Sequence, residues 1–371
     1  MFAKENIRKI LSSYGNPAIA TICSHSALQI FAGAKQEGFR TIGICTKDRM
    51  ETYRAFPHAA PDEFIIVEKF SDALKPEVQK ELREKNAIII PHGSFVEYLG
   101  PGRIEREFEV PIFGNRAVLG WESDREKSRL WLEKNAGLRM PAKVSPDKID
   151  RLCIVKFDGA KGGRGYFFAS DRNELDEGIR QRIESGMVSE EAAKTASLQE
   201  YVLGTRYYFH YFYTPLSGKG FPAGEGSVEL LGIDRRDESN IDELHRLGMD
   251  GGELSKRKIN LSYTVTGNQP AVIRESLLPA AFSDARKVVE ASIKLFPPGI
   301  VGPFCLETVC TPNLEIVTFE VSARIVAGTN IYADGSQYSH LFFGKPVSMG
   351  QRIAQEIKIA IGKNMLEKVV Y

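Results

Sequence analysis

Two glutamates late in the chain lie in strand-like segments that are otherwise apolar. Glu307 lies in GPFCLETVC and Glu320 lies in IVTFEVSAR. A buried carboxylate without a partner is costly, and two carboxylates on neighbouring strands repel each other unless a cation lies between them. Carboxylate oxygens suit Mg²⁺, which usually binds through one or two of them together with substrate phosphates. We therefore favour a metal site, and the alternative is that each glutamate pairs with an arginine, such as Arg324 for Glu320.

A glycine-rich stretch, VKFDGAKGGRGYFFA at residues 155–169, places flexibility and positive charge between two segments with strand-like composition. A dinucleotide fingerprint would lead from a strand into a helix, and a Walker loop needs G-K-[ST] at the start of a helix. Neither pattern is present. Glycines allow a backbone to fold close over a ligand and to direct N–H groups at it. The stretch predicts a hairpin flap over phosphates, with Lys156 on the strand before it, and a flexible surface hairpin is an equally weighted alternative.

Two polar clusters follow strand-like segments near the N-terminus. Ser24-His25-Ser26 comes after the first segment and Pro91-His92-Gly93-Ser94 comes after the fourth. Ligands of parallel sheets bind beyond the carboxyl ends of the strands, so His25 and Ser94 are candidate binding residues. A lone histidine is more often structural or a solvated surface group. A Ser–His hydrolase dyad ranks low because no G-x-S-x-G sequence surrounds either serine.

A weaker signal is Gln199-Glu200-Tyr201-Val202 inside a long run of strand-forming residues. A carboxylate followed by free backbone groups could hold the edge of an adenine. On its own, a structural polar residue is the better interpretation of this segment.

The elements that must position these residues alternate in the first third of the chain. Short apolar strands alternating with helices are typical of a parallel, doubly wound sheet. The expected strands there start near residue 18 and cover 41–46, 63–68, 87–91 and 111–115, and a helix covers 4–13. The expected elements of the remainder are a charged helix from 121 that stops at Gly137, strands on both sides of the glycine-rich stretch, helices at 173–184 and near 189–196, strands within 197–214 and from 228, a charged loop at 236–258, a helix at about 277–295, and strands at 302–310 and 314–323.

Composition excludes several classes of protein. The chain has 371 residues, enough for two or three compact units, and its net charge is only +1. A protein that tracks nucleic acid is usually more basic, so an anionic ligand here is expected to be small and held by a local cluster. No apolar run approaches the roughly 18 residues that suggest a membrane span, and the charged N-terminus does not resemble a secretion signal.

The five cysteines form no C-x-x-C pair, and their number is odd. Buried free thiols in a reducing cytoplasm fit this usage best, and a single bridge between Cys305 and Cys310 is the less favoured alternative. We therefore expect a cytoplasmic protein.

Taken in order, these features resemble the ATP-grasp superfamily, which uses ATP and Mg²⁺ to activate carboxylates as acyl phosphates. The similarity is closer to one archaeal branch, the 5-formaminoimidazole-4-carboxamide ribonucleotide synthetases of purine biosynthesis, and it covers essentially the whole chain. The glycine loop is the least specific of the shared motifs. The motifs are PHGSF (91–95), IVKFDGAKGGRGYFFA (154–169), DESNID (237–242), TGNQPAVIRESLLP (266–279), GPFCLE (302–307) and SMGQRIAQEIK (348–358).

The resemblance implies a mixed α/β and α+β architecture, an ATP-grasp fold with an N-terminal Rossmann-like parallel sheet. Residues 1–120 would bind the acceptor nucleotide, 121–205 would form the lid with its glycine-rich hairpin, and 206–371 would carry the metal site. The implied enzyme is an ATP-dependent carbon–nitrogen ligase. It would phosphorylate formate and transfer the formyl group to the 5-amino group of 5-aminoimidazole-4-carboxamide ribonucleotide (AICAR), giving the formamido nucleotide (FAICAR), ADP and phosphate.

The cofactors implied by the resemblance are ATP and Mg²⁺ or Mn²⁺. It further implies a homo-oligomer, a trimer or hexamer, with small-molecule substrates and no nucleic-acid or membrane partner. Two rivals stay open: another ATP-grasp carboxylate–amine ligase, and an inactive paralogue that only binds a purine nucleotide. The presence of Lys156, Glu307 and Glu320 argues against the second.

The family's site residues transfer to this sequence by motif. The aminoimidazole nucleotide would contact His25, Ser94 and Asn268. ATP would contact Glu238, Lys156, the hairpin residues Gly159, Gly162, Gly163, Arg164 and Gly165, and the adenine-holding Glu200 and Val202. Glu307 and Glu320 would hold the metal, and Arg324 and Asn330 are candidate contacts of phosphate or formate. One departure is Arg206, which stands where many ATP-grasp enzymes carry an acid, and Glu238 is a candidate to replace part of that role.

Overall fold

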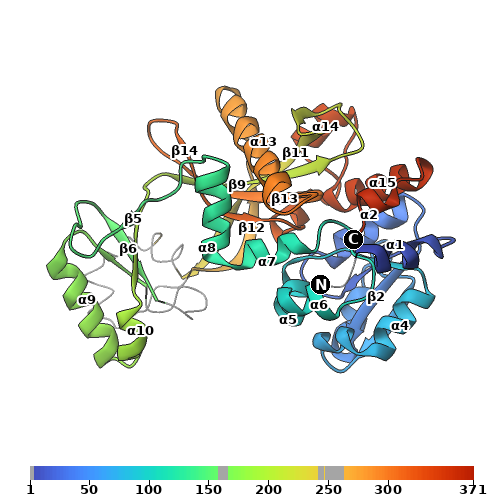
Figure 1. The fold of residues 1–371 in the computed structure, drawn as a ribbon, viewed down its shortest axis with the longest axis horizontal. Helices are drawn as coiled ribbons and strands as arrows, with labels where there is room; N and C mark the ends of the chain where they lie inside the picture. The colour runs from blue at the N-terminus through green and yellow to red at the C-terminus, as the bar shows by residue number, and fades with distance from the viewer. Residues whose placement is uncertain (1–3, 158–165, 241–245, 247–262) are drawn as a thin grey trace.

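A computed structural model describes residues 4–157, 166–240, 246 and 263–371. Three sheets follow one another along the chain (Figure 1). The parallel sheet lies at one end of the molecule, the small sheet with its two helices lies at the other, and the largest sheet lies between them.

The first sheet is parallel, with the order β3-β2-β1-β4, as the alternating pattern predicts. Its central strands are apolar and buried on both faces, which is what helices on both sides of a parallel sheet require. The strands are β1 (Ala18–Ile22), β2 (Thr41–Thr46), β3 (Glu63–Val67) and β4 (Ala87–Ile89). The helices around them are α1 (Lys4–Ser12), α2 (Ala27–Gln36), α3 (Met50–Arg54), α4 (Pro76–Glu84), α5 (Gly93–Leu99) and α6 (Pro101–Glu107).

The second sheet is small and antiparallel, with the order β5-β8-β6-β7. Its strands β6 and β7 flank the glycine-rich stretch and pair antiparallel, as expected, while the stretch itself at 158–165 lies outside the described residues. The strands are β5 (Lys143–Val144), β6 (Cys153–Lys156), β7 (Phe167–Ala169) and β8 (Ser197–Glu200), and the helices are α9 (Arg172–Glu184) and α10 (Glu190–Lys194).

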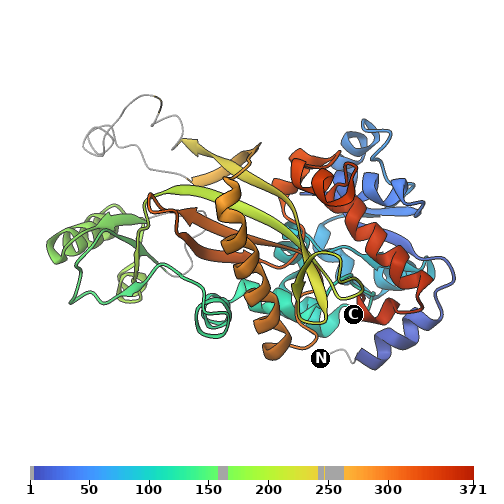
Figure 2. The ribbon, with the colours of Figure 1, turned by 90° about the horizontal axis from the view of Figure 1, so that it is seen from above.

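The third sheet is antiparallel along β10-β11-β9-β13-β14, with β12 paired to β11. Helix α13 (Leu278–Leu295) crosses one face of it, as Figure 2 shows from above, and buries Ala281, Ala285 and Val288 there. This helical spacing forms the apolar stripe that packs a helix against a sheet. The strands are β9 (Thr205–Thr214), β10 (Phe221–Ala223), β11 (Gly226–Asn240), β12 (Tyr263–Pro270), β13 (Gly302–Cys310) and β14 (Ile316–Ser322).

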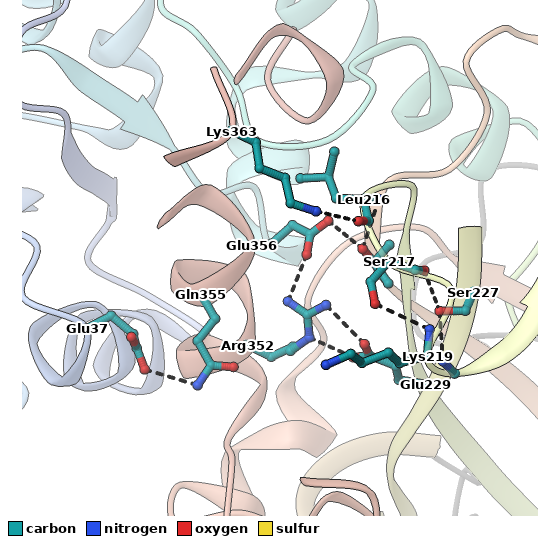
Figure 3. Close-up of polar contacts among 12 residues, drawn as sticks. Glu37, Leu216, Ser217, Lys219, Ser227, Glu229, Arg352, Gln355, Glu356 and Lys363 are labelled. Carbon is teal, nitrogen blue, oxygen red and sulfur yellow. Dashed lines mark hydrogen bonds and ion pairs between the residues drawn. The ribbon is translucent and has the colours of Figure 1, made fainter. Parts of the chain in front are cut away.

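The C-terminal helix α15 (Met349–Gly362) ties the first and third sheets together. It packs on α2, and its Arg352 forms a buried ion pair with Glu229 of β11, with Nε–Oε2 and Nη2–Oε1 distances of 2.7 and 3.0 Å (Figure 3). Glu356 accepts a further bond from the Arg352 guanidinium at 2.9 Å. Helix α14 (Gln337–Phe343) precedes α15.

Three predicted elements are wrong in detail. The charged helix from 121 is broken at Asp124 into α7 (Ala117–Ser123) and α8 (Arg125–Arg129), followed by a π-helical segment at Leu130–Asn135. Asp124 breaks it because its carboxylate accepts the N–H groups of Glu126 and Lys127 and so starts a new helix.

The segment 111–115 makes only isolated bridges, to Ile89 of β4 and to Val370, rather than a strand. The charged stretch from 236 continues as strand β11 to Asn240 because β12 pairs with it; most of the remainder of that stretch lies outside the described residues.

All five cysteines are free, as predicted, so the alternative bridge between Cys305 and Cys310 does not form. Among the described residues, no helix is both long and apolar enough to cross a bilayer.

Candidate functional site

One cavity of about 1530 Å³ runs between the three sheets. Its volume exceeds the roughly 300–1,000 Å³ of a pocket for one small ligand, so it has room for more than one. The parallel sheet contributes His25, Gly93 and Ser94 to its lining. The small sheet contributes Lys156, Tyr166 and 197–202, and the large sheet with its following turn contributes Arg206, Glu320 and Arg324 among others.

At one end of the cavity, His25 lies on the turn after β1 with a left-handed backbone φ of 55°. Its ring stacks on that of His92, with centroids 5.2 Å apart and an interplanar angle of 1°. Nearby, Ser24 Oγ donates to Ser94 Oγ at 3.1 Å, which joins the ends of β1 and β4. The two polar clusters of the sequence therefore meet at one edge of the sheet, as the parallel topology requires.

His25 is neutral at physiological pH. Its ring lines the cavity among protein groups, and this removal from bulk solvent lowers its pKa to about 3. The charge of His92 and of two arginines, Arg324 and Arg236, adds to the effect. A neutral imidazole at this place can exchange hydrogen bonds with a ligand but supplies no positive charge.

Along the cavity from this end, Lys156 ends strand β6 and donates to Gln199 Oε1 at 2.5 Å. Burial lowers its pKa, and the charge of Arg125 lowers it further, while the carboxylate of Glu320 acts in the opposite direction. The lysine and Glu320 thus line the same part of the cavity. An anionic group bound between them would restore the balance of charge at Lys156.

Glu200 and Val202 also line the cavity. The Glu200 carboxylate accepts two bonds from Arg139, at 2.9 and 3.0 Å, and one from the N–H of Ala142 at 2.9 Å. The hydrogen bonds from Arg139 hold its pKa below the ordinary value. The Glu200 carboxylate therefore makes hydrogen bonds within the protein, as the interpretation of Glu200 as a structural polar residue would have it.

The two glutamates of the expected metal site lie directly opposite each other on β13 and β14. Glu307 is held by the guanidinium of Arg236, with two contacts of 2.8 and 3.0 Å. The charge of Glu307, followed by enclosure in the protein, raises the pKa of Glu320 to about 7. The pairing of Arg324 with Glu320 is wrong, because Arg324 pairs instead with Glu122 at 3.3 Å.

The carboxylate pair fits a divalent cation. The repulsion that raises the pKa of Glu320 is the interaction that a bound cation would relieve. Within the described ranges, no group of three or more histidines, cysteines, aspartates or glutamates is arranged for a metal. A cation at Glu307 and Glu320 would thus need oxygen atoms from a ligand, as Mg²⁺ commonly takes them from phosphates.

The face of the large sheet that carries Glu307 and Glu320 also carries a row of polar residues that sequence reasoning missed. They are Tyr208 and His210 of β9 and Asp234 and Arg236 of β11. The Arg236 guanidinium lies 3.6 Å from the centroid of the Tyr208 ring on its way to Glu307. IDRRDES gave no signal for this row, because every residue after Ile233 is polar and the segment does not show the alternation that tells one face of a strand from the other.

Four expected site residues do not line the cavity themselves but bond to neighbouring groups: Glu307, held by Arg236 as described above, and Glu238, Asn330 and Asn268. Glu238 accepts two bonds from Arg206, at 3.0 and 3.3 Å. Arg206, which stands where many ATP-grasp enzymes carry an acid, therefore pairs with the acid that is the candidate to replace it. Asn330 Nδ2 donates to the carbonyl of His25 at 3.1 Å. Asn268 Nδ2 donates to Asp234 Oδ2 at 2.6 Å. The five hairpin residues expected to contact ATP (Gly159, Gly162, Gly163, Arg164 and Gly165) lie outside the described residues.

Comparison with known proteins decides the family. A curated protein of Methanococcoides burtonii, a "5-formaminoimidazole-4-carboxamide-1-(beta)-D-ribofuranosyl 5'-monophosphate synthetase", is 51% identical to this chain, and the match covers 100% of both chains. The chain belongs to this synthetase family. The equally named synthetase of Methanocaldococcus jannaschii is 46% identical, again over 100% of both chains. Residues 19–144 match a "Protein of unknown function (DUF1246)" and residues 174–371 a "Domain of unknown function (DUF1297)".

Solved structures support the same assignment for the fold. The crystal structure of an IMP biosynthesis protein, PurP from Thermococcus kodakaraensis, superimposes with a TM-score of 0.72 and 30% identity, covering 95% of this chain and 100% of that one. An ADP complex of the N5-carboxyaminoimidazole ribonucleotide synthetase purK shares the fold alone, with a TM-score of 0.58, 14% identity and coverage of 93% and 77%. The predicted ATP-grasp fold with its N-terminal parallel sheet is thus confirmed for this synthetase.

Proposed function

We propose that this protein is an ATP- and formate-dependent ligase that formylates AICAR to FAICAR in purine (IMP) biosynthesis. The observation that carries the proposal is one cavity that joins the polar edge of the parallel sheet to Lys156 and to Glu320, the cavity-lining member of the carboxylate pair. Its full-length relatives are synthetases named for the same product.

The charged and polar residues along the cavity indicate which substrate each end would bind. His25 and Ser94, with Asn268 beside them, would hold the acceptor nucleotide at one end. Lys156 would hold ATP phosphates at the other end. This arrangement supports the expected division into an acceptor unit at 1–120, a lid at 121–205 and a metal-binding unit at 206–371.

The reaction needs two transfers in one enclosed place. A formate oxygen attacks the γ-phosphorus of ATP, and the bond to the leaving ADP oxygen breaks, giving formyl phosphate. The acceptor's 5-amino nitrogen then attacks the formyl carbon, inorganic phosphate leaves with the bonding electrons, and the nitrogen loses a proton. Phosphoryl transfer depends mostly on positioning and neutralisation of charge, and acyl phosphates hydrolyse in water.

The chain's own residues supply most of these needs. Lys156 would bind the transferred phosphoryl group, and a Mg²⁺ or Mn²⁺ held by Glu307 and Glu320 would neutralise charge on the phosphates. Arg324 is the candidate for formate, because its guanidinium lies beside His25 and Gly93. A Cβ built on Gly93 would lie 2.8 Å from His25 Nε2 and 3.6 Å from the guanidinium carbon of Arg324. Asn330, bonded to the His25 carbonyl, is the second candidate contact there.

Phosphate release tests the proposal. We expect release only when ATP, Mg²⁺, formate and AICAR are all present, with one FAICAR formed for each phosphate. Release without formate, or none with the complete set, would refute it. Acetate in place of formate addresses the rival assignment to another carboxylate–amine ligase. Lys156→Met is expected to abolish release, while Lys80→Met, at an exposed ion pair with Glu84 on α4 outside the cavity, is not.

The expected homo-oligomer, a trimer or hexamer, stays a prediction that light scattering of the purified protein tests. The five free thiols are consistent with action in the cytoplasm, where we expect the reaction to take place.

A further inference from the structure

A buried carboxylate lies at the centre of the large sheet, next to the proposed acceptor end of the cavity. Asp234 of β11 has no exposed side-chain surface. Its Oδ1 lies 2.7 Å from His210 Nε2 on β9, and its Oδ2 accepts from Asn268 Nδ2 on β12 at 2.6 Å. Apolar residues of similar size would fill such a place at a lower cost in desolvation, so packing alone gives little reason for a charge here.

This carboxylate decides which way the Asn268 amide faces. A carboxylate only accepts hydrogen bonds, so Asn268 must present its NH₂ group to Asp234 and its oxygen elsewhere. His210 fixes the carboxylate in turn, because its Nε2 must carry the proton that it donates. His210 Nδ1 is buried and has no hydrogen-bond partner within the described part of the chain, so the pair with Asp234 is its one polar attachment there.

Asp234 also touches the turn that supports the other side of the proposed acceptor site. A Cβ at Gly328 would lie 2.4 Å from Asp234 Oδ1, so the turn approaches the carboxylate more closely than any side chain permits. The same turn carries Asn330, which donates to the His25 carbonyl at 3.1 Å. Asn268 and the backbone of His25 therefore both depend on the position of one carboxylate.

We propose that Asp234 and His210 are positioning residues that fix the Asn268 amide so that its oxygen accepts a hydrogen bond from an N–H group of the acceptor. The inference rests on the proposed function, which places the acceptor at Asn268. It adds a basis for specificity: an amide oxygen favours an acceptor with an amine or carboxamide N–H at this point and disfavours a carboxylate there.

Asp234→Asn tests the proposal, because an amide at 234 lets the Asn268 side chain turn either way. We expect the KM for AICAR to rise roughly 2- to 10-fold, the range for loss of one hydrogen bond between neutral groups, with the KM values for ATP and formate unchanged. Calorimetric binding of AICAR without ATP should weaken by the same factor. The matched control is Asp237→Asn, which makes the same change from carboxylate to amide at an exposed bond of 2.7 Å from Gln269 between the same two strands and should leave AICAR binding unchanged.

A double-mutant cycle separates positioning from a merely structural role. In an Asn268→Ala background, Asp234→Asn should weaken AICAR binding no further, because no amide remains to be oriented. Additive losses would overturn the proposal. If Asp234→Asn does not fold, His210 replaces it in the test. His210→Gln keeps a donor to Asp234 and should bind AICAR more tightly than His210→Leu, and equal binding by these two variants would overturn the proposal.

The outcomes for the two levels of inference differ. Wild-type protein that binds AICAR in the calorimeter but releases no phosphate would refute the ligase and leave the binding cycle to decide the role of Asp234. Wild-type protein that neither binds nor formylates AICAR would overturn both. A working ligase with an additive cycle would overturn only the positioning role.

Discussion

The ionisation of Glu320 gives the sharpest test of the carboxylate pair. The charge of Glu307 raises its pKa from 4.5 to about 7. At pH 6 about one tenth of Glu320 would therefore be ionised, whereas an ordinary glutamate would be almost fully ionised. Because the folded pKa lies above the unfolded value, protonated Glu320 stabilises the metal-free protein below pH 4.5, and this contribution is lost as the pH rises through about 7.

Carbon-13 NMR of protein labelled at the glutamate side-chain carboxyls measures this titration directly, and the resonance absent from Glu320→Gln identifies the group. We expect a midpoint near 7 in the wild type without metal. Glu307→Gln removes the largest cause of the shift and leaves two arginines, Arg236 and Arg324, which favour the charged form, so the midpoint should fall by about one pH unit or more. Mg²⁺ with ADP should also lower it, because the cation competes with the proton.

The exposed Glu315, on the turn between β13 and β14, is the control. Its replacement by Gln should leave the curve of Glu320 unchanged. A wild-type midpoint near 4.5, or one that stays the same in Glu307→Gln, would show that the two carboxylates do not repel each other, and the argument for a cation between them would fail.

Two further predictions concern stability. Arg352→Ala leaves two buried carboxylates without their partner and should cost about 3–5 kcal/mol in urea unfolding. Lys358→Ala removes from the same helix an exposed lysine that pairs with Glu37 and should cost less than about 1 kcal/mol. Equal losses would contradict the assigned role of burial. Gly33→Ala places a Cβ 2.1 Å from a backbone nitrogen of α15 and should lower the melting temperature through about 1–3 kcal/mol of overpacking. Gly362→Ala, where a Cβ meets nothing within 4 Å, should not lower it, and a drop as large as that of Gly33→Ala would speak against the tight contact.

The elements that depend on residues close together in the chain could be predicted from the sequence. The four parallel strands are apolar runs that end in polar residues, so both the strands and the meeting of His25 with Ser94 at their carboxyl ends could be predicted. The break at Asp124 was also readable, because an aspartate before R-E-K is a good start for a helix. The long charged stretch hid this signal because its composition suits a continuous helix.

The polar contacts of the site depend on pairs far apart in the chain, and a single sequence does not show these. Arg236 contacts Glu307, which lies 71 positions later in the chain. Arg324 forms its ion pair with the distant Glu122 and not with Glu320, which is only four positions away. Strand β14 ends at Ser322, so Arg324 no longer follows the alternation that would place it beside Glu320. Asp234 was missed because nothing local marks a carboxylate that will be buried by two other strands.

The contact between α2 and α15 has a consequence for how the protein is made. Gln29 accepts the N–H of Gly350 at 3.0 Å and donates to Asn330 at 3.1 Å, so the helix that follows the first strand is completed by residues more than 300 positions later. The N-terminal sheet leaves the ribosome first, but this side of α2 stays uncovered until the last helix has been synthesised. An unfinished chain would therefore expose the apolar residues of α2 for most of its synthesis, which makes this helix the expected site of chaperone contact on the nascent protein.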